Sequence, residues 1–266
     1  MKISSVDLSK ITTYRFGGVC NSFIELEDKE DLNNLGDRVF EKENIIIGKG
    51  SNVAFSDKEF QGNVICPKFT KIEKNSETEI TVGASVFLPD LSRYFKENEY
   101  SNGEFLIGIP GTVGGAVKMN AGAYDWEFSD LIQNIECFDL STSSIIKLSK
   151  DDINFSYRSS QNLDNKIILS ATLKIEVGDI NKINSNLANF NKIRKNSQPP
   201  AIYNAGSVFK NTKEYAAGKL IDEAGLKGFE IDGVSVSEKH ANFFIAKKEA
   251  KSLSLYKLVQ HVKEII

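Results

Sequence analysis

Two glycine-rich segments carry the residues with the clearest capacity for chemistry. The first consists of Gly48, Lys49, Gly50, Ser51 and Asn52. The second consists of Gly108, Ile109, Pro110, Gly111, Thr112, Val113, Gly114, Gly115 and Ala116, followed by Met119, Asn120, Ala121, Gly122 and Ala123. Glycine allows positive φ angles and has no Cβ, so backbone N–H groups can converge on paired phosphates. Tight turns have the same composition, but two such segments in one chain favour a diphosphate site.

Neither segment matches the common nucleotide-binding motifs. The first lacks the third glycine of GxGxxG because position 53 is Val53, and neither ends in the GK[ST] of a Walker loop. The sequence therefore gives no support to a Rossmann or P-loop interpretation.

Histidine and cysteine are scarce. A histidine-built metal site or a Ser-His-Asp triad would have to use His240 or His261. The cysteines, Cys20, Cys66 and Cys137, are far apart and form no CxxC pair. We expect no bound metal and no disulfide framework.

Apolar runs and their periods predict the elements that must position these segments. Alternating or continuous apolar runs predict strands at 23–26, 44–47, 63–65, 79–82, 132–140, 144–148 and 167–177. Helical periods predict helices at 29–40, 89–99 and 180–193, the last ending at a polar stretch that starts with Arg194. Beyond Pro200 we expect a helix at 214–224, a strand at 242–246 and a helix from Glu249. Strands and helices without regular βαβ alternation predict an α+β fold.

Bulk composition narrows the class of protein. The formal net charge of −3 gives no electrostatic footprint for nucleic acid, so we expect no nucleic-acid partner. The first 16 residues contain no apolar core long enough for a signal peptide, and no later run reaches membrane length. These features predict a cytoplasmic protein without membrane insertion.

Six motifs together resemble the UDP-N-acetylenolpyruvoylglucosamine reductase family, in the order in which that family has them. Besides the two glycine-rich segments, the motifs are TTYRFGG at 12–18, FSYRSS at 155–160, NAGSVFKN at 204–211 and SEKHANF at 237–243. The string IPGTVGGA followed by NAGAY is highly specific, and NAGSVFKN is nearly so. The resemblance extends over almost the whole chain.

The resemblance implies three parts. Two N-terminal α+β subdomains, expected at 1–70 and 71–195, would form an FAD-binding unit of the PCMH and vanillyl-alcohol-oxidase type. A smaller α+β substrate-binding domain would follow at 196–266. The compact stretch between Arg158 and Ser207 is similar to the shorter family type, which lacks an extra substrate-covering loop. NADPH would be the hydride source, a UDP-sugar the substrate, and a monomer the working form.

The resemblance also assigns catalytic roles. Hydride delivery to the terminal carbon of an enolpyruvyl ether leaves negative charge beside a carboxylate, which must be stabilised and then protonated. Arg158 matches the family's carboxylate-binding cation, and a guanidinium can bind a carboxylate through two hydrogen bonds. Ser207 matches the family's proton donor. Taken alone, Arg158 could equally form an ion pair and Ser207 a turn or N-cap.

Binding roles follow in the same way. The resemblance predicts that the cofactor-binding residues are Gly48, Lys49, Gly50, Ser51, Asn52, Pro110, Gly111, Thr112, Gly114, Gly115, Asn120, Ala121 and Gly122. The expected substrate-binding residues are Tyr157, Lys210 and Asn211. His240 is expected to be structural.

Two features depart from the family pattern. Lys49 occupies a position where a third glycine is usual, and it would either crowd the backbone or add charge beside a diphosphate. Relatives usually continue past the last helix into a segment with a glutamate that stabilises the enolate, whereas this sequence stops at Ile266. Glu264 lies too early in the final helix to take that role, so we assign no catalytic glutamate.

Two other functions fit parts of the sequence. A related FAD-dependent oxidase acting on an alcohol or sugar is one, although no histidine precedes position 240 to tether a flavin. A non-catalytic module that binds FAD or a UDP-sugar is the other. Bleaching of a bound flavin by NADPH, followed by its recovery with the enolpyruvyl substrate, separates the three.

Overall fold

The computed structural model describes residues 1–36, 39 and 42–266, and these fold into two compact units. Unit 1 comprises Met1–Ser4, Ser22–Gly48 and Gln61–Lys192. Unit 2 comprises Ser5–Asn21, Lys49–Phe60 and Ile193–Ile266. Two N-terminal segments thus belong to the same unit as the C-terminal residues.

A four-stranded sheet is built from the N-terminal region. Its order is β1-β2-β4-β3, with β1 at Lys2–Asp7, β2 at Val19–Leu26, β3 at Asn44–Ile46 and β4 at Asn63–Pro67. β4 runs parallel to both β2 and β3 and is buried along its whole length, as a strand covered on both faces should be. The three strands predicted here are confirmed, and β1 was not predicted.

The helix predicted at 29–40 is interrupted where it is described, and Val39 is again helical. Its start is present as α1, Glu30–Asn33, and a turn follows at 34. Positions 37, 38 and 40 of the predicted range lie outside the described residues.

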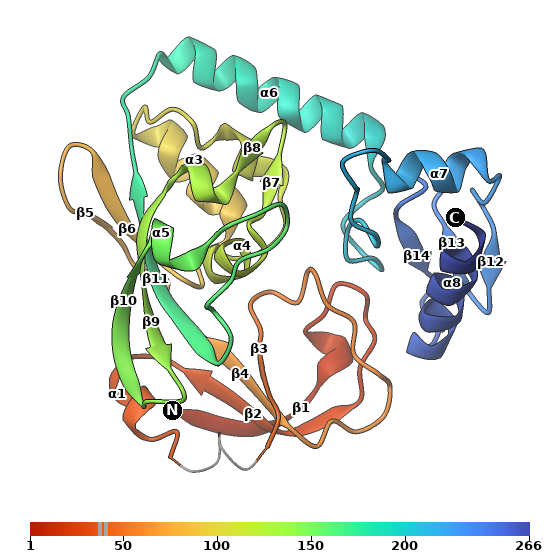
Figure 1. Ribbon diagram of the computed structural model, residues 1–266, viewed down its shortest axis with the longest axis horizontal. Helices are drawn as coiled ribbons and strands as arrows, with labels where there is room; N and C mark the ends of the chain where they lie inside the picture. Colours follow the sequence, from red (N-terminus) through yellow and green to blue (C-terminus); the bar gives the residue numbers. More distant parts are fainter. Residues whose placement is uncertain (37–38, 40–41) are drawn as a thin grey trace. The chain divides into compact units, whose positions relative to one another are not determined.

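Unit 1 contains a five-stranded antiparallel sheet. Its order is β10-β9-β11-β6-β5, with β10 at Ser144–Ser149, β9 at Ile132–Asp139, β11 at Lys166–Lys174, β6 at Glu79–Gly83 and β5 at Ile72–Lys74. Figure 1 shows β9, β10 and β11 as neighbouring green strands. The predicted strands are confirmed, while β5 was not predicted.

A β-bulge changes how the central strand faces its two cores. The pairing of β11 with β9 shifts between Ile168 and Ser170. Before the shift, Ile167 and Leu169 pack in a core with β2 and β4; after it, Ala171 and Leu173 pack in the larger core of unit 1. One extra residue reverses the side-chain alternation. The alternating apolar residues that predicted this strand therefore pack into two different cores. The strand ends at Lys174 rather than at 177.

The remaining elements of unit 1 are short, apart from α6 (Ile180–Ser197), whose last residues belong to unit 2. They are α3 at Leu88–Glu97, α4 at Val113–Met119, α5 at Lys150–Ile153, the ribbon of β7 at Gly122–Ala123 and β8 at Trp126–Glu127, and 3-10 turns at Glu104–Gly108 and Phe128–Asp130. The predicted helix at 89–99 is confirmed as α3, where Leu91 and Phe95 are buried.

The helix α6, Ile180–Ser197, runs one turn further than the sequence pattern predicted. The expected break at Arg194 is wrong, because Arg194 and Lys195 favour the negative end of the helix dipole. The prolines at 199 and 200 follow one residue after the helix, where proline is common because it cannot continue a helix.

Unit 2 contains a three-stranded antiparallel sheet and two helices. The sheet order is β12-β13-β14, with β12 at Glu230–Ile231, β13 at Val234–Val236 and β14 at Phe244–Ala246, and the helices are α7 at Ala217–Glu223 and α8 at Ser252–Ile265. Figure 1 shows α8 beside β12 and β13. The predictions at 214–224, 242–246 and from 249 are confirmed with later starts.

The core of unit 2 includes residues from the N-terminal part of the chain. Tyr14 and Phe16 stack on each other and pack with Phe244, Leu258 and Val262. The Tyr14 hydroxyl donates a 2.9 Å hydrogen bond to the carbonyl oxygen of Phe244. The TTYRFGG motif therefore contributes to packing in this unit. Among the residues that the structure describes, no helix is both long and apolar enough to cross a lipid bilayer.

Candidate functional site

The two glycine-rich segments approach each other at Gly48. Gly48 follows the buried Ile47 after β3, and a Cβ built on it would lie 2.4 Å from Oγ1 of Thr112. Both residues belong to unit 1. A Cβ at that separation would force something to move, so Gly48 permits a close approach of the backbone to the second segment.

The rest of the first segment belongs to unit 2 and makes a tight turn. Gly50 has a φ of 63°, and a Cβ there would lie 2.1 Å from the carbonyl oxygen of Ile11. The backbone N–H of Thr13 donates to the Gly50 carbonyl at 3.0 Å. Lys49 is exposed and its φ is not positive. A lysine at this position therefore fits the backbone, and its side chain does not crowd the turn.

The second segment is a turn followed by a helix, which the sequence analysis did not predict. Thr112 is the N-cap of α4, and its Oγ1 accepts a hydrogen bond from Gly115 N at 3.4 Å. The Gly111 carbonyl accepts from Leu88 N at 2.9 Å, and Gly114 N donates to the Ala84 carbonyl at 2.8 Å. The signal was available in the buried residues Val113, Ala116 and Val117, whose spacing is helical.

Gly115 is the position in α4 that packing does not explain. It is exposed and helical, and a Cβ there would meet only Oγ1 of Thr112, at an ordinary 3.7 Å. Alanine would stabilise an exposed helical position by about 0.5–1 kcal/mol relative to glycine. A glycine where the protein itself has room for a side chain fits a backbone that a ligand approaches closely. The backbone at Gly115 therefore has the open surface that a cofactor-binding segment needs.

Arg158 lies at the tip of a turn in unit 1, which we call the arginine turn (residues 156–159). Reciprocal 3.0 Å backbone hydrogen bonds between Ser156 and Ser159 close the turn. Arg158 has a φ of 50°, which non-glycine residues adopt at a cost. Its guanidinium carbon lies 4.8 Å from the centroid of the Tyr157 ring, within cation–π range. The structure thus brings two predicted site residues together.

The guanidinium of Arg158 contacts groups within the NAGAY string and just after it. Nη2 donates to the Gly122 carbonyl at 2.6 Å, and Nη1 donates to the Asn120 carbonyl at 3.3 Å. Nη1 also pairs with Oε1 of Glu127 at 3.4 Å. The side chains of Arg158 and Glu127 are 29% and 32% exposed, so the pair lies partly open to solvent.

Asn120 is the buried centre of this cluster. Its Nδ2 donates to Oε2 of Glu127 at 2.7 Å and to the Ser156 carbonyl at 3.0 Å, while its Oδ1 accepts from Ser129 N. It has no exposed surface and has the left-handed conformation at the end of α4. Its side-chain amide is committed to these protein partners, and its carbonyl accepts from Arg158.

Ser207 lies in unit 2 on an irregular segment bonded to the side chains of two asparagines, which we call the serine segment (residues 204–211). Oδ1 of Asn204 accepts from Gly206 N at 3.2 Å. The side chain of the buried Asn242 bonds both the N–H and the carbonyl of Phe209, each at 2.9 Å. Ser207 itself is exposed and forms an isolated bridge with Phe243.

The other predicted residues of the serine segment differ in their roles. Lys210 is exposed. Oδ1 of Asn211 accepts from Ala217 N at 3.0 Å, at the first residue of α7. Arg158 and Tyr157 are thus in one unit, and Ser207, Lys210 and Asn211 in the other.

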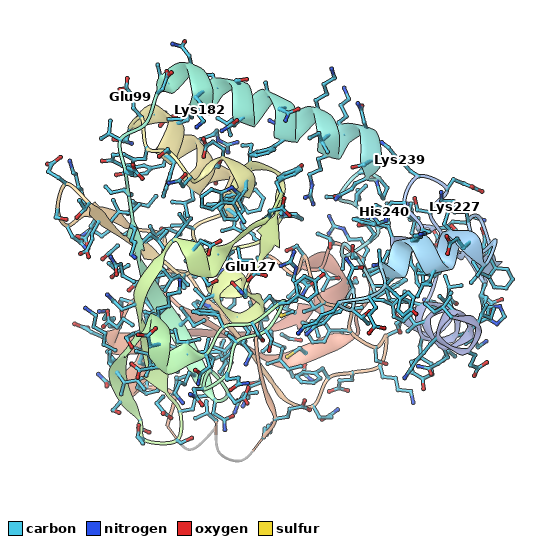
Figure 2. All side chains as sticks on the ribbon, turned by 45° about the horizontal axis from the view of Figure 1, so that its top comes forward. Glu99, Glu127, Lys182, Lys227, Lys239 and His240 are labelled. Atoms are coloured by element: carbon cyan, nitrogen blue, oxygen red, sulfur yellow. The ribbon has the colours of Figure 1, made fainter. Side chains whose placement is uncertain are left out.

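His240 supports Asn242. Its Nδ1 accepts a 3.2 Å hydrogen bond from the backbone N–H of Asn242, and its ring packs edge-on to Phe243. Burial lowers the pKa of His240, and the charge of Lys227 lowers it further. Figure 2 labels both residues on unit 2. The neutral ring is the form that can accept this bond, which fits the structural role expected from the sequence.

Two functional candidates were missed by sequence reasoning, Glu127 and Asn242. Glu127 is two residues beyond Asp125, on the ribbon that follows NAGAY, and nothing in its spacing shows that it reaches Arg158. Asn242 is within SEKHANF, where its motif membership was the only signal. Over the described residues, no group of three or more His, Cys, Asp or Glu side chains is arranged to hold a metal ion.

Comparisons with known proteins agree with this geometry. Residues 26–149 match a family model described as an FAD binding domain. Residues 198–266 match one described as the C-terminal domain of UDP-N-acetylenolpyruvoylglucosamine reductase.

Whole-chain relatives carry the same name. The chain is 37% identical over 263 residues to the UDP-N-acetylenolpyruvoylglucosamine reductase of Chlamydia felis, covering 97% of this chain and 87% of that protein. The Rickettsia massiliae enzyme is 36% identical, with 97% and 88% covered. The crystal structure of the Thermus caldophilus enzyme superposes with a TM-score of 0.91 at 30% identity, covering 100% of this chain and 96% of that one.

Proposed function

The chain belongs to the UDP-N-acetylenolpyruvoylglucosamine reductase family, and from this premise we propose that Arg158 and Ser207 carry its chemistry. The family's enzyme reduces UDP-N-acetylglucosamine enolpyruvate to UDP-N-acetylmuramate in peptidoglycan synthesis, with FAD and NADPH. Membership favours this activity over an alcohol or sugar oxidase and over a non-catalytic module. The observation that carries the proposed roles is the network that fixes Arg158.

FAD, when bound, supplies the hydride chemistry, taking hydride from NADPH and giving it to the enolpyruvyl double bond. The residues proposed to hold it are Gly48, Lys49, Gly50, Ser51, Asn52, Pro110, Gly111, Thr112, Gly114, Gly115, Asn120, Ala121 and Gly122. The close approach at Gly48 and the open position at Gly115 support this assignment.

Gly115 gives a direct test of the cradle. Gly115→Ala should stabilise the FAD-free protein by about 0.5–1 kcal/mol in thermal unfolding, and it should raise the FAD dissociation constant about tenfold, which is about 1.4 kcal/mol. Gly48→Ala is the contrasting control and should destabilise the fold itself, because its Cβ would lie 2.4 Å from Thr112 Oγ1. Unchanged FAD affinity in Gly115→Ala would remove this helix from the cofactor site.

Arg158 is proposed to bind the carboxylate of the enolpyruvyl group. Negative charge grows beside this carboxylate as hydride arrives at the terminal carbon, so a fixed cation stabilises the transition state more than the ground state. The Gly122 and Asn120 carbonyls accept hydrogen bonds without cancelling the positive charge. Tyr157, beneath the guanidinium, and Lys210 and Asn211 are proposed to contact the rest of the substrate.

Ser207 is proposed to give a proton to the carbon that bears the carboxylate. The hydroxyl is a weak acid, but the carbon it protonates is strongly basic once hydride has been delivered. The transfer requires the hydroxyl to be placed accurately. The bonds from Asn204 and Asn242 to the backbone of the serine segment support that placement.

The proposal has three further parts. Residues 1–70 and 71–195 would hold the cofactor and 196–266 the substrate, which the two family-model matches at 26–149 and 198–266 support. The working form would be a monomer, which size-exclusion chromatography with light scattering tests. The compartment would be the cytoplasm, where NADPH and nucleotide sugars are present together.

An anaerobic absorbance experiment tests the function itself. The purified, FAD-loaded protein should lose its flavin absorbance on addition of NADPH. It should regain that absorbance on addition of UDP-N-acetylglucosamine enolpyruvate. A protein that takes up no FAD, or a flavin that NADPH bleaches and this substrate does not restore, would contradict the proposal.

A further inference from the structure

Glu127 forms an ion pair with Arg158, and no role has yet been given to it. Its Oε1 lies 3.4 Å from Nη1 of Arg158, and its Oε2 accepts from the buried Asn120 at 2.7 Å. Asn120 in turn bonds the Ser156 carbonyl, at the start of the arginine turn. Glu127 therefore acts on Arg158 in two ways: directly through the ion pair, and indirectly through Asn120, which bonds the arginine turn.

We propose that Glu127 is a positioning residue that aims the Arg158 guanidinium at the substrate carboxylate. This inference rests on the proposed function, because it assumes that Arg158 binds that carboxylate. The two carbonyl contacts of Arg158 fix one side of the guanidinium, and Glu127 adds an attraction that keeps the long side chain from leaving them.

The geometry of the pair suits positioning rather than neutralisation. Strong arginine–carboxylate pairs form two parallel hydrogen bonds of about 2.7–2.9 Å. Glu127 instead contacts one nitrogen, with one oxygen, at 3.4 Å, and both side chains are about a third exposed. Such a pair orients the guanidinium while leaving its charge available to a second carboxylate, that of the substrate.

Glu127 also has a local structural role that must be separated from this one. It is the N-cap of the 3-10 turn Phe128–Asp130, in a capping box with Asp130. If capping were its only role, its loss would change stability and not the reaction with substrate. Glu127→Gln is the discriminating variant, because an amide oxygen can still accept from Asn120 and the backbone N–H can still donate to Asp130, while the negative charge is lost.

Glu136→Gln is a matched control. Glu136 is also in unit 1, on β9, is 31% exposed, and pairs at 2.6 Å with Lys29, the N-cap residue of α1. The same chemical change is thus made at an ion pair without a proposed role. Both variants are measured as FAD-loaded, full-length protein. Stopped-flow absorbance follows two steps separately, flavin reduction by NADPH and flavin reoxidation by UDP-N-acetylglucosamine enolpyruvate.

Glu127→Gln should slow flavin reoxidation about tenfold, equivalent to about 1.4 kcal/mol. Flavin reduction in this variant should stay within about twofold of wild type. Both steps in Glu136→Gln should also stay within about twofold of wild type. In an Arg158→Lys background, Glu127→Gln should cost less than about twofold, because residues that act through one another are not additive. Equal slowing of both steps, unchanged reoxidation, or the same factor in both backgrounds would overturn the proposal. Failure of the proposed function would give a different result, because the wild-type protein itself would then not complete flavin reduction by NADPH and reoxidation by the substrate.

Discussion

The arginine turn and the serine segment hold their functional groups in different ways. Arg158 is restrained through its side chain, whose guanidinium contacts the Asn120 and Gly122 carbonyls and Glu127. Ser207 is exposed, and what is restrained around it is the backbone, through the side chains of Asn204 and Asn242. The arginine side chain is long and flexible, so its guanidinium is positioned only if partners contact the guanidinium itself. The serine hydroxyl is one bond from Cβ, so fixing the backbone largely fixes its position.

Removing the hydroxyl should have the largest effect. Ser207→Ala should slow flavin reoxidation by the enolpyruvyl substrate about 10³-fold, within the range of about 10²–10⁴ for lost general acid catalysis. Flavin reduction by NADPH should remain close to wild type, because no proton from Ser207 enters that step. Rapid-mixing absorbance of each half-reaction measures this, and equal loss in both would contradict the proton-donor role.

Replacing the cation comes next. Arg158→Lys should slow reoxidation about 10²-fold, comparable to the loss of one oxyanion-stabilising donor. An ammonium keeps the charge but cannot reproduce the planar contacts to both the Asn120 and Gly122 carbonyls and a carboxylate. Steady-state turnover and the two half-reactions report the effect. Near-normal reoxidation would take Arg158 out of the site.

The backbone restraint of the serine segment can be tested without touching Ser207. Asn242→Ala leaves the N–H and carbonyl of Phe209 without their partner and should cost about 1–3 kcal/mol in urea unfolding. Reoxidation should slow about tenfold in protein that remains folded. If stability falls while reoxidation by substrate is unchanged, the asparagine does not position the serine, and the contrast between the two regions fails.

The smallest effect concerns His240 and pH. The pKa of His240 is lowered in the folded protein, so the unfolded chain binds the proton more readily. Its contribution to stability is therefore complete above the ordinary pKa of about 6.5 and declines as pH falls from there toward the folded-state pKa. Thermal unfolding of wild type and His240→Asn between pH 5 and 8 should show the difference between the two proteins narrowing at the acid end. A difference that widens on acidification would mean that the ring is stabilised by its proton.

Local signals in the sequence predicted much of the fold. The motifs supplied Arg158, Tyr157 and Ser207 as candidates whose roles are proposals, whereas period-two and period-3.6 patterns located β9, β10, β11, α3 and α6. These succeed because burial imposes the period of each element on its own residues.

The parts that were missed depend on contacts between distant positions. The bulge in β11 depends on its pairing with β9, and no residue type within the strand predicts the bulge. The contact between Glu127 and Arg158 joins residues 31 positions apart, and the packing of Tyr14 against Phe244 joins residues 230 apart. The helix α4 was not predicted because its glycines are typical of a loop, although Val113, Ala116 and Val117 have helical spacing.

The central claim is that a fixed cation and a proton donor act in one step on one substrate. The most direct test is the rate of substrate-driven flavin reoxidation in the Arg158→Lys, Ser207→Ala double variant. Residues that act as a unit lose much less together than the product of their separate losses, so the double variant should react little more slowly than Ser207→Ala. A rate reduced by the full product of the two single effects, or a matching fall in flavin reduction by NADPH, would contradict the account.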